Sequence, residues 1–367
     1  MKKLKVFISL LTLTIILTAC GTQSVTPTPQ QTAEITPTST PTAAVEIADN
    51  STLAVHFIDV GQADAALLQC EDDYMLIDGG NVADSNLIIA YLKKLNIECI
   101  DYMVCTHAHE DHVGGLSAPL SVMPVGAVYA PAMEADTKAY QTFKRKVAEQ
   151  NTEIIHPVNH ENFPLSSARV EILATPDNAD NLNNSSIILK VTHGNKYFLF
   201  TGDAEREEEQ TLLGTGLLKA DVLKVGHHGS DTSTSYVFLR EVMPEYAVIS
   251  CGKDNSYGHP TEEVLSRLRD ADVKVYRTDL QGDIVAISDG ENITFTTVRN
   301  ENIQTNETEK ADTSAIDTET AYIGNVKSKK FHRPSCNTLP AEKNRVELSS
   351  REEAINSGYS PCSLCLP

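Results

Sequence analysis

The ten residues THAHEDHVGG, at positions 106–115, constrain this chain more than any other stretch. Five side chains of metal-ligand type follow one another closely there: His107, His109, Glu110, Asp111 and His112. The apolar run before them is typical of a strand, so the cluster lies on the loop that leaves it. Imidazole and carboxylate groups hold zinc, manganese or iron. A solvated polar loop is the alternative, but it does not account for this density. We therefore expect a metal site here, followed by a tight turn at Gly114 and Gly115.

Three later turns also present ligand-type side chains directly after an apolar, strand-like run. FLFTGDAE presents Asp203, VGHHGS presents His227 and His228, and NSYGHP presents His259. Each turn by itself fits an ordinary polar loop, and an isolated His259 would be assigned to one. Paired metal ions need a bridging carboxylate and ligands from distant segments. Together the four turns therefore predict a site for two metal ions.

The N-terminus indicates export. Lys2, Lys3 and Lys5 precede an apolar run that is too short for an ordinary bilayer span. The sequence LTAC then ends at Cys20 and resembles a bacterial lipobox, in which this cysteine carries the lipid. An uncleaved anchor or a buried helix is the alternative. We predict a signal peptide at 1–20 and attachment to the extracellular face of the cell membrane, or secretion, with no transmembrane helix after processing.

Two polar segments divide the remaining chain. Residues 21–51 are rich in Thr and Pro, and residues 299–320 are acidic. Neither segment contains enough apolar surface to offset the entropy of ordering it, so both are predicted to be linkers. They delimit a large domain at 52–298 and a small one at 321–367.

Short strand-like runs alternate with helical periodicity in the large domain, which indicates an α/β fold. Helices are expected at 85–97, 137–150, 204–213, 235–243 and 261–271. The first strands lie close together as hairpins, which argues against a purely parallel sheet and favours two stacked mixed sheets with helices outside. Four cysteines in apolar runs are predicted to be mostly buried free thiols: Cys70, Cys99, Cys105 and Cys251. A Cys99–Cys105 disulfide is the alternative.

The motifs HAHEDH, LIDGG, FTGD, GHHGS and YGHP resemble those of the metallo-β-lactamase-fold hydrolases. Within that superfamily, FIDVGQADA, NNSS and GHHGSDTSTS are similar to the soluble hydrolase domain of ComEC/Rec2-type competence proteins. The resemblance covers roughly residues 53–298. It implies an αβ/βα sandwich with the metals at one edge, between the sheets.

The resemblance also implies a role for each matching residue. It implies two divalent ions, zinc or manganese, bound by six side chains: His107 and His109 for the first, Asp111, His112 and His259 for the second, and Asp203 between them. Groups that would orient these ligands are Asp59, Asp78 and Asn184. Residues that would face the substrate phosphate or assist proton transfer are His228, His227 and Asp111.

One departure from the superfamily pattern concerns the first ion. The superfamily has a third histidine ligand where this chain has the sequence NNSS, at residues 183–186. Water or an asparagine oxygen would complete the ion instead. The nearest histidine, His193, falls in a predicted hairpin turn and is expected at the surface.

The small domain has two pairs of ligand-type residues separated by a loop and a helix. The pairs are His332 with Cys336 and Cys362 with Cys365. This spacing predicts one structural zinc ion, and a disulfide among the cysteines is the alternative. So small a domain, with few large apolar groups, would need such a metal to fold.

The same segment resembles the zinc-binding domain of Ada-type DNA-repair proteins. Because His332 stands where Ada has its methyl-accepting cysteine, the repair activity is not carried over. A DNA-binding role remains possible through four basic residues beside an aromatic side chain: Lys327, Lys329, Lys330 and Arg333.

A net charge of −20 argues against general electrostatic attraction to nucleic acid, although metal ions can supply positive charge where a phosphate docks. The function expected is a secreted, lipid-anchored, metal-dependent phosphodiesterase that acts on extracellular DNA. One alternative is a phosphodiesterase for another substrate, such as phosphorylcholine. A second is a non-catalytic module that binds DNA and aids its uptake. Hydrolysis of β-lactams is disfavoured by the NNSS sequence and the HHGS turn.

Overall fold

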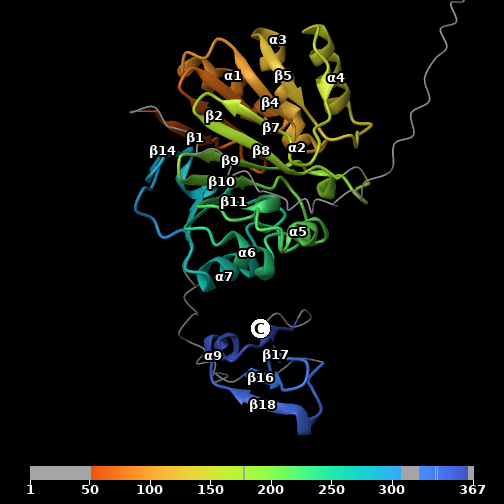
Figure 1. The fold of residues 1–367 in the computed structure, drawn as a ribbon, viewed down its shortest axis with the longest axis vertical. Coiled ribbons are helices and arrows are strands. Elements are labelled where there is room, and N and C mark those ends of the chain that lie inside the picture. Colours follow the sequence, from red (N-terminus) through yellow and green to blue (C-terminus); the bar gives the residue numbers. More distant parts are fainter. Residues whose placement is uncertain (1–50, 177, 307–321, 335, 337, 363–367) are drawn as a thin grey trace, which may run out of the picture. The chain divides into compact units, whose positions relative to one another are not determined.

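The computed structural model describes residues 51–176, 178–306, 322–334, 336 and 338–362 (Figure 1). The predicted signal peptide with Cys20, nearly all of the Thr/Pro-rich segment, much of the acidic segment and Cys365 lie outside these residues. Of the helices in the described ranges, none combines the length and the hydropathy needed to cross a bilayer.

Two mixed sheets face each other in the larger domain, with eight and seven strands in the described residues (Figure 1). The order in the first sheet is β15 (Ile293–Thr297), β14 (Ile284–Ser288), β1 (Leu53–Phe57), β2 (Ala66–Cys70), β3 (Asp73–Ile77), β4 (Ile100–Val104), β5 (Val125–Tyr129) and β6 (Ile154–Ile155). The order in the second is β13 (Lys274–Arg277), β12 (Tyr246–Ile249), β11 (Val222–Lys224), β10 (Lys196–Phe200), β9 (Ile188–His193), β8 (Ala168–Ala174) and β7 (Asn162–Leu165). The predicted α/β fold with two mixed sheets is confirmed.

Helices cover the outer face of each sheet. Those over the first sheet are α1 (Ser85–Lys94), α3 (Pro119–Val122) and α4 (Lys138–Glu149), and those over the second are α5 (Arg206–Leu212), α6 (Tyr236–Val242) and α7 (Glu262–Asp270) (Figure 1). Two short helices, α2 (Glu110–Val113) and α8 (Thr278–Gln281), lie in loops. The five predicted helices are therefore present, each shorter than its apolar periodicity suggested. This arrangement is an αβ/βα sandwich.

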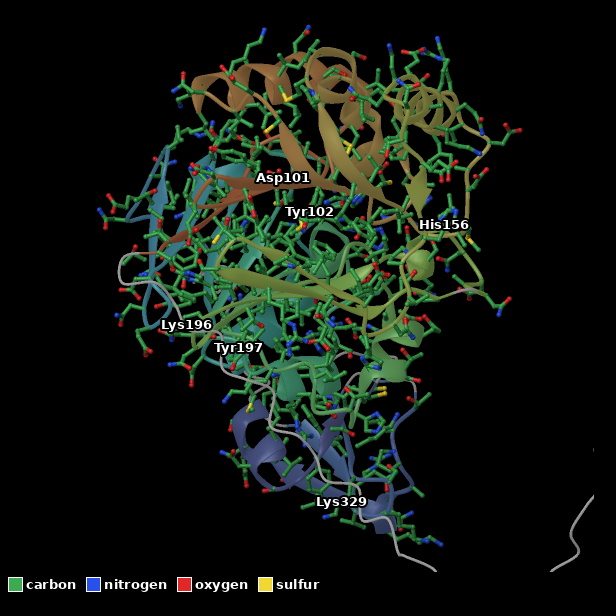
Figure 2. All side chains as sticks on the ribbon, turned by 45° about the horizontal axis from the view of Figure 1, so that its top comes forward. Asp101, Tyr102, His156, Lys196, Tyr197 and Lys329 are labelled. Carbon is green, nitrogen blue, oxygen red and sulfur yellow. The ribbon has the colours of Figure 1, made fainter. Side chains whose placement is uncertain are left out.

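Aromatic side chains join the two sheets across the central core. Phe57 of β1 stacks on Phe200 of β10 with ring centroids 6.0 Å apart, and Tyr102 of β4 stacks on Phe163 of β7 at 4.5 Å. Figure 2 labels Tyr102 on β4 of the first sheet and Tyr197 on β10 of the second. Offset aromatic pairs of this kind add to the stabilisation from buried apolar area. The core is thus complete without contributions from the polar loops at the sheet edge.

Strand direction brings the predicted ligand loops to one edge. β3, β4 and β5 run parallel in the first sheet, and β10, β11, β12 and β13 run parallel in the second. Because parallel strands end on the same side, the loops after β3, β4, β10, β11 and β12 gather together. These loops carry the predicted ligands and their neighbours.

The larger domain extends beyond both predicted boundaries. Ser51, placed in the first linker by the sequence, is buried and lies 3.1 Å from the His193 ring. Arg299, placed in the second linker, forms an ion pair with Asp59 at 2.7 Å, and the buried Thr305 donates a hydrogen bond to the carbonyl of Val275. The described part of this domain therefore runs from Ser51 to Asn306.

Two expectations about single residues are wrong. His193 is not in a surface turn: it is the last residue of β9, fully buried, with Ser51 and Ser288 hydroxyls on its two ring nitrogens. Cys99 is exposed, not buried. Cys70, Cys105 and Cys251 are buried as predicted, and Cys99 and Cys105 are both free thiols, so the alternative disulfide between them does not form.

The small domain contains a sheet of four strands in its described residues, in the order β18 (Arg345–Leu348), β16 (Tyr322–Asn325), β17 (Lys330–His332) and β19 (Ser360–Pro361). Helix α9 (Arg351–Asn356) begins after Ser350, whose hydroxyl accepts a hydrogen bond from the Glu353 amide. The core is small and consists of Phe331, Leu348, Ala354 and Tyr359, with Tyr322 and Val346 packed against it.

Candidate metal centre

The loop after β4 presents its ligands by folding directly into α2. His107 and His112 are fully buried, and His109 is the N-cap residue directly before α2. The predicted tight turn does not explain the two glycines, because Gly114 has an ordinary helical φ of −55° that any residue could adopt. Close packing explains them instead. A side-chain carbon on Gly115 would lie 2.0 Å from the carbonyl oxygen of Gly79. The glycines therefore allow this loop to pack against the loop after β3.

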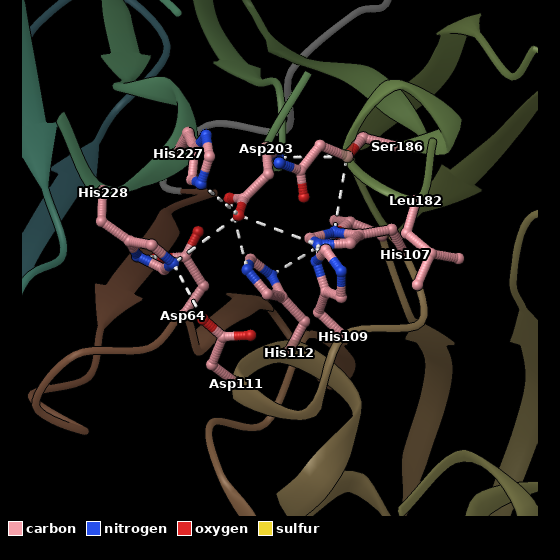
Figure 3. Close-up of polar contacts among 12 residues, drawn as sticks. Asp64, His107, His109, Asp111, His112, Leu182, Ser186, Asp203, His227 and His228 are labelled. Carbon is pink, nitrogen blue, oxygen red and sulfur yellow. Dashed lines mark hydrogen bonds and ion pairs between the residues drawn. The ribbon is translucent and has the colours of Figure 1, made fainter. Parts of the chain in front are cut away.

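Two groups of ligand-type side chains meet at Asp203 (Figure 3). The first group consists of His107, His109 and Asp203, and the second of Asp111, His112 and His228. Within each group the ligand atoms lie within 4.8 Å of one another. The Asp203 carboxylate is 3.3 Å from Nε2 of His112 and 3.8 Å from Nε2 of both His107 and His228. Asp203 thus faces both groups.

Several buried polar atoms at this point make no hydrogen bond and have only long ion-pair contacts. Nε2 of His112 faces Oδ1 of Asp203 at 3.3 Å, and Nε2 of His228 faces Oδ2 of Asp111 at 3.4 Å. A buried polar atom without a partner costs free energy, and native proteins rarely leave several together. A divalent cation would satisfy these buried atoms at once. The donors, imidazole nitrogens and carboxylate oxygens, suit zinc or manganese, so the residues present fit the metals that the sequence implied.

His259 lies outside both groups in the described structure, and His228 is in the group where His259 was predicted. The reason is strand order. Asp203 follows β10 and His228 follows the adjacent β11, whereas His259 follows β12, one strand further away. His259 instead lies at the pocket mouth, with its ring 5.8 Å from the His227 ring.

Asp78, at the end of β3, orients one of the buried imidazoles. Its Oδ2 atom is 2.8 Å from Nδ1 of His112, which directs Nε2 of that ring towards Asp203. The Asp78 carboxylate also accepts hydrogen bonds from the amide and the hydroxyl of Thr106. Hydrogen bonds of this kind fix the tautomer and the orientation of a ligand.

The prediction for Asp59 is wrong, because its carboxylate pairs with Arg299 and not with an imidazole. The carboxylate that faces an imidazole in its place is Asp64. Nδ1 of His228 donates a hydrogen bond to the Ser250 carbonyl at 3.1 Å and lies 3.2 Å from Oδ1 of Asp64. Its Oδ2 lies 2.8 Å from the ammonium group of Lys224, and both side chains are buried. The sequence offered a signal that was missed: Lys224 interrupts an apolar strand just before GHHGS, and a buried lysine requires an acidic partner.

Ser186, and not an asparagine, lies beside His107 where the superfamily has its third histidine. The Ser186 hydroxyl is 3.4 Å from Nδ1 of His107 and accepts a hydrogen bond from the Asp203 amide at 3.0 Å. Asn184 contacts the neighbouring loops and not the ligands. Its side-chain oxygen accepts a hydrogen bond from the Glu205 amide, and its amino group donates one to the Asp180 carboxylate. Asn184 therefore fixes the Asp203 loop without contacting the histidines.

The site concentrates charge of both signs. Burial alone would lower the pKa of His112, but Asp203 and Asp78 outweigh burial and raise it well above its usual value. Burial is likewise outweighed at His228, where Asp203 and Asp64 raise the pKa to about 10. At His107 burial dominates and lowers the pKa. These carboxylates stabilise positive charge in the pocket, which is the property that a cation site needs.

The turn that carries His227 and His228 has an unusual backbone. Both residues have positive φ angles, 51° and 54°, which side chains other than glycine rarely adopt. Each such residue costs about 1–3 kcal/mol and persists only where its surroundings hold it. Backbone hydrogen bonds of the turn itself provide that support: the His227 amide donates to the Gly202 carbonyl at 3.1 Å, and the Ser230 amide donates to the His227 carbonyl at 2.8 Å.

A pocket of about 260 Å³ opens from the two groups to the surface. It is lined by Gln62, His109, Glu110, Asp111, Asn183, Asp203, His227, His228, Tyr257 and His259. His227 is partly exposed, with Nε2 3.6 Å from Asp203. Asp111 and Glu110 are also accessible from the pocket, so the ligand groups are open to substrate on this side.

A separate cluster lies in the small domain. His332, Cys336 and Cys362 bring their ligand atoms within 4.8 Å of one another, and the predicted fourth ligand, Cys365, is outside the described residues. Cys336 is a free thiol, so it forms no disulfide with Cys362. Thiol and imidazole donors in this arrangement fit a structural zinc ion. The predicted DNA-contacting residues Lys327, Lys329, Lys330 and Arg333 are all exposed, and Lys329 lies over the Tyr359 ring at 4.5 Å (Figure 2).

Comparison with known families agrees with this architecture. Residues 58–166 match the metallo-beta-lactamase superfamily, and residues 306–367 match the metal binding domain of Ada. The larger domain therefore has the metallo-β-lactamase fold, and the small domain that follows it is similar to the metal binding domain of Ada.

Among curated proteins, the chain is 36% identical over 229 residues to "Competence protein ComA" of Neisseria gonorrhoeae, covering 61% of this chain and 30% of that protein. It is 33% identical over 258 residues to "ComE operon protein 3" of Bacillus subtilis, covering 63% and 32%. The chain thus spans about a third of the length of these relatives. Among solved structures, the metallo-beta-lactamase fold protein YhfI of Bacillus subtilis is 15% identical with a TM-score of 0.46, covering 65% of this chain and 100% of that one.

Proposed function

We propose that this protein is a metal-dependent phosphodiesterase that cleaves DNA outside the cell, where it is held by a lipid on Cys20. The observation that carries the proposal is the meeting of two open ligand groups at Asp203. His107, His109 and Asp203 would hold one divalent ion, and Asp111, His112 and His228 would hold the other. When bound, such a pair activates water and offsets charge on a phosphoryl group.

The chain's own side chains would position the substrate around that centre. His227 faces the pocket from the mouth, with Nδ1 3.1 Å from the Thr232 hydroxyl and its ring partly exposed. It is the histidine of the turn that is not in a ligand group, so we assign to it the contact with a phosphate oxygen and the transfer of a proton to the leaving oxygen. His228, a candidate for that role from sequence, would serve as a ligand instead.

Three observations support DNA as the substrate. One relative named above is a competence protein, and the second domain is similar to the metal binding domain of Ada. The four exposed basic residues of the small domain give it a surface suited to phosphate contacts. In this proposal the small domain holds the strand while the larger domain cleaves it.

The substrate is tested by incubating the purified protein, whose metal content is measured by mass spectrometry, with three substrates. They are a DNA strand, a DNA duplex and a chromogenic phosphocholine ester, each in added manganese, zinc or magnesium. The proposal requires DNA cleavage that depends on manganese or zinc. If the protein hydrolyses only the phosphocholine ester, the proposed substrate is that ester and not DNA. Binding of DNA without cleavage under every metal would favour the uptake-module alternative.

The anchor is tested separately by expressing the full chain and a Cys20→Ser variant and separating membranes from medium. We expect the full chain in the membrane fraction and the variant in the medium or unprocessed. Equal membrane attachment of a processed Cys20→Ser protein would contradict the lipid anchor.

A further inference from the structure

Tyr257 is the most exposed large hydrophobic side chain among the described residues, with 71% of its surface accessible. It lines the pocket that contains His109, Asp111 and Asp203. A single exposed apolar side chain is ordinary on a protein surface, so it is the position of this ring at the mouth of the pocket that is informative. It is a suitable arrangement for contact with a planar group of the substrate.

The Tyr257 ring is held in place in spite of its exposure. It stacks on the His259 ring, with centroids 5.7 Å apart and planes 29° from parallel. One side chain organises the loop beneath it: Asn255 accepts hydrogen bonds from the amides of Tyr257 and His259, both at 3.1 Å, and donates to the carbonyl of Gly252 at 2.9 Å. A ring fixed in advance loses little entropy when it binds a ligand.

The loop is also tied to the opposite sheet across the pocket. The Gln62 side-chain oxygen accepts a hydrogen bond from the Gly252 amide at 3.0 Å, and Gln62 follows β1 of the first sheet. The distance between the ring and the ligand groups is therefore set by both sheets and not by the loop alone. The structure therefore holds the Tyr257 ring at a fixed place in the wall of the pocket that contains the ligand groups.

The charges that line the pocket decide which kind of nucleic acid suits it. The described residues of the lining include the carboxylates of Glu110, Asp111 and Asp203 but no lysine or arginine. Binding to duplex DNA depends largely on cationic side chains along its phosphates. Stacking of a base on an aromatic ring needs no such charge, but it requires a base that is not already stacked and paired.

We infer that Tyr257 is a stacking platform for the base next to the cleaved phosphate, so that the site takes single-stranded DNA in preference to duplex. This inference rests on the proposed phosphodiesterase function. The Tyr257 ring, backed by His259, would receive one unpaired base. The adjoining phosphate would then lie over the pocket, where His227 contacts it.

The inference is tested with Tyr257→Ala and Tyr257→Phe in the full-length, metal-loaded protein. On a single strand we expect Tyr257→Ala to raise KM by about 5-fold to about 100-fold, the range for loss of one base–aromatic stack, while Tyr257→Phe stays close to wild type. On a strand of the same length that lacks bases around the cleaved position, the wild type should already be weakened and Tyr257→Ala should add little. The wild type should also prefer the base-bearing strand to duplex.

A second readout does not depend on cleavage. A strand with phosphorothioate linkages and a 2-aminopurine base should lose fluorescence on binding to the wild type and to Tyr257→Phe, because stacking quenches this base, but not on binding to Tyr257→Ala.

The remaining outcomes separate the two proposals. Equal KM values for wild type and Tyr257→Ala on base-bearing strands would overturn the stacking platform while leaving the phosphodiesterase intact. Dependence on Tyr257 for a phosphocholine ester but not for DNA would assign the ring to a quaternary ammonium group. If the wild type, with its metals bound, cleaves no phosphodiester, both proposals fail together.

Discussion

The two ligand clusters of this chain differ in what surrounds them. The cluster in the larger domain consists of imidazoles and carboxylates at the ends of strands from two sheets, beside a core that includes Phe57, Phe200 and Phe163. The cluster in the small domain combines one imidazole with thiols, beside a core of four buried side chains. From this difference we expect the larger domain to keep its fold without metal, and the small domain to depend on its metal for folding.

The largest expected effect follows from removing zinc from the small domain. Chelation should unfold this domain in the intact chain, because zinc binding contributes about 10 kcal/mol to folding in domains of this size and the core of four side chains cannot replace it. The larger domain should keep its structure. Hydrogen exchange read by mass spectrometry, with and without chelator, measures both domains at once.

Cys336→Ser should reproduce the effect of the chelator, and Cys99→Ser, at an exposed free thiol, should not. If chelation left hydrogen exchange in residues 322–362 unchanged, the fold of the small domain would not depend on its metal, and the difference between the two clusters would be disproved.

The second largest effect is expected for Asp203→Asn, which should lower activity without lowering the stability of the larger domain. Asp203→Asn should lower kcat/KM for DNA by roughly 10³-fold or more, since the residue faces both ligand groups and metal activation is worth several kcal/mol. The melting temperature of the larger domain should stay within a few degrees, because Asp203 is not part of the apolar core.

Asp272→Asn is the matched control for Asp203→Asn. Asp272 is exposed and precedes β13, which places it at the opposite edge of the second sheet, and asparagine tolerates its positive φ. Unfolding of the Asp203→Asn protein, or full activity in it, would contradict the separation of site and fold.

Acid should destabilise the larger domain through its core. His56 of β1 is buried, with Nδ1 3.0 Å from the Tyr91 hydroxyl, and burial lowers its pKa to about 4. The ring is neutral in the folded protein, so its stabilising contribution is present above about pH 6.5 and is lost as the pH falls towards 4. The loss is on the order of 3 kcal/mol.

This pH effect is measured as the free energy of unfolding in urea at pH 7 and pH 4.5. The His56→Gln variant should show a smaller fall between the two values than the wild type, and the exposed control His156→Gln should behave as the wild type. An equal fall in all three proteins would remove His56 as the cause.

The smallest effect concerns the buried pair behind His228. Replacing both members, in Asp64→Asn with Lys224→Met, removes two charges without leaving one alone. Metal affinity of the second ligand group should fall by about 10-fold to about 100-fold, the usual result of losing a residue that orients a ligand. Titration calorimetry with zinc or manganese measures this change. Equal affinity in the wild type and the double variant would show that the His228 ring is oriented by other contacts.

Local motifs predicted the parts of the site that lie close together in sequence. His107, His109, Asp111 and His112 lie within six residues directly after β4, so one strand end brings all four to one place. The choice of His228 over His259, and of Asp64 over Asp59, depends on which strands are neighbours. Spacing along the chain does not contain that information, because it is set by pairing across the sheets.

The fold was predictable where the apolar pattern was strong. The helices with one apolar face and the central strands were predicted, whereas β5, β6, β7 and β15 were not. Two of them carry signals against a strand, Gly126 in β5 and Pro164 in the edge strand β7. Aromatic stacking between the sheets overrides those local preferences: Tyr129 of β5 stacks on Phe163 of β7, and Phe295 of β15 stacks on Tyr276 of β13.

The central claim is that this fold gathers distant turns into a site for paired cations. Anomalous diffraction from crystals of the full chain grown with manganese or zinc tests it directly. We expect two peaks beside the Asp203 carboxylate, one within bonding distance of His107 and His109 and the other within bonding distance of His112 and His228. Diffraction that shows these side chains turned away from one another, with no anomalous peak among them, would contradict the account.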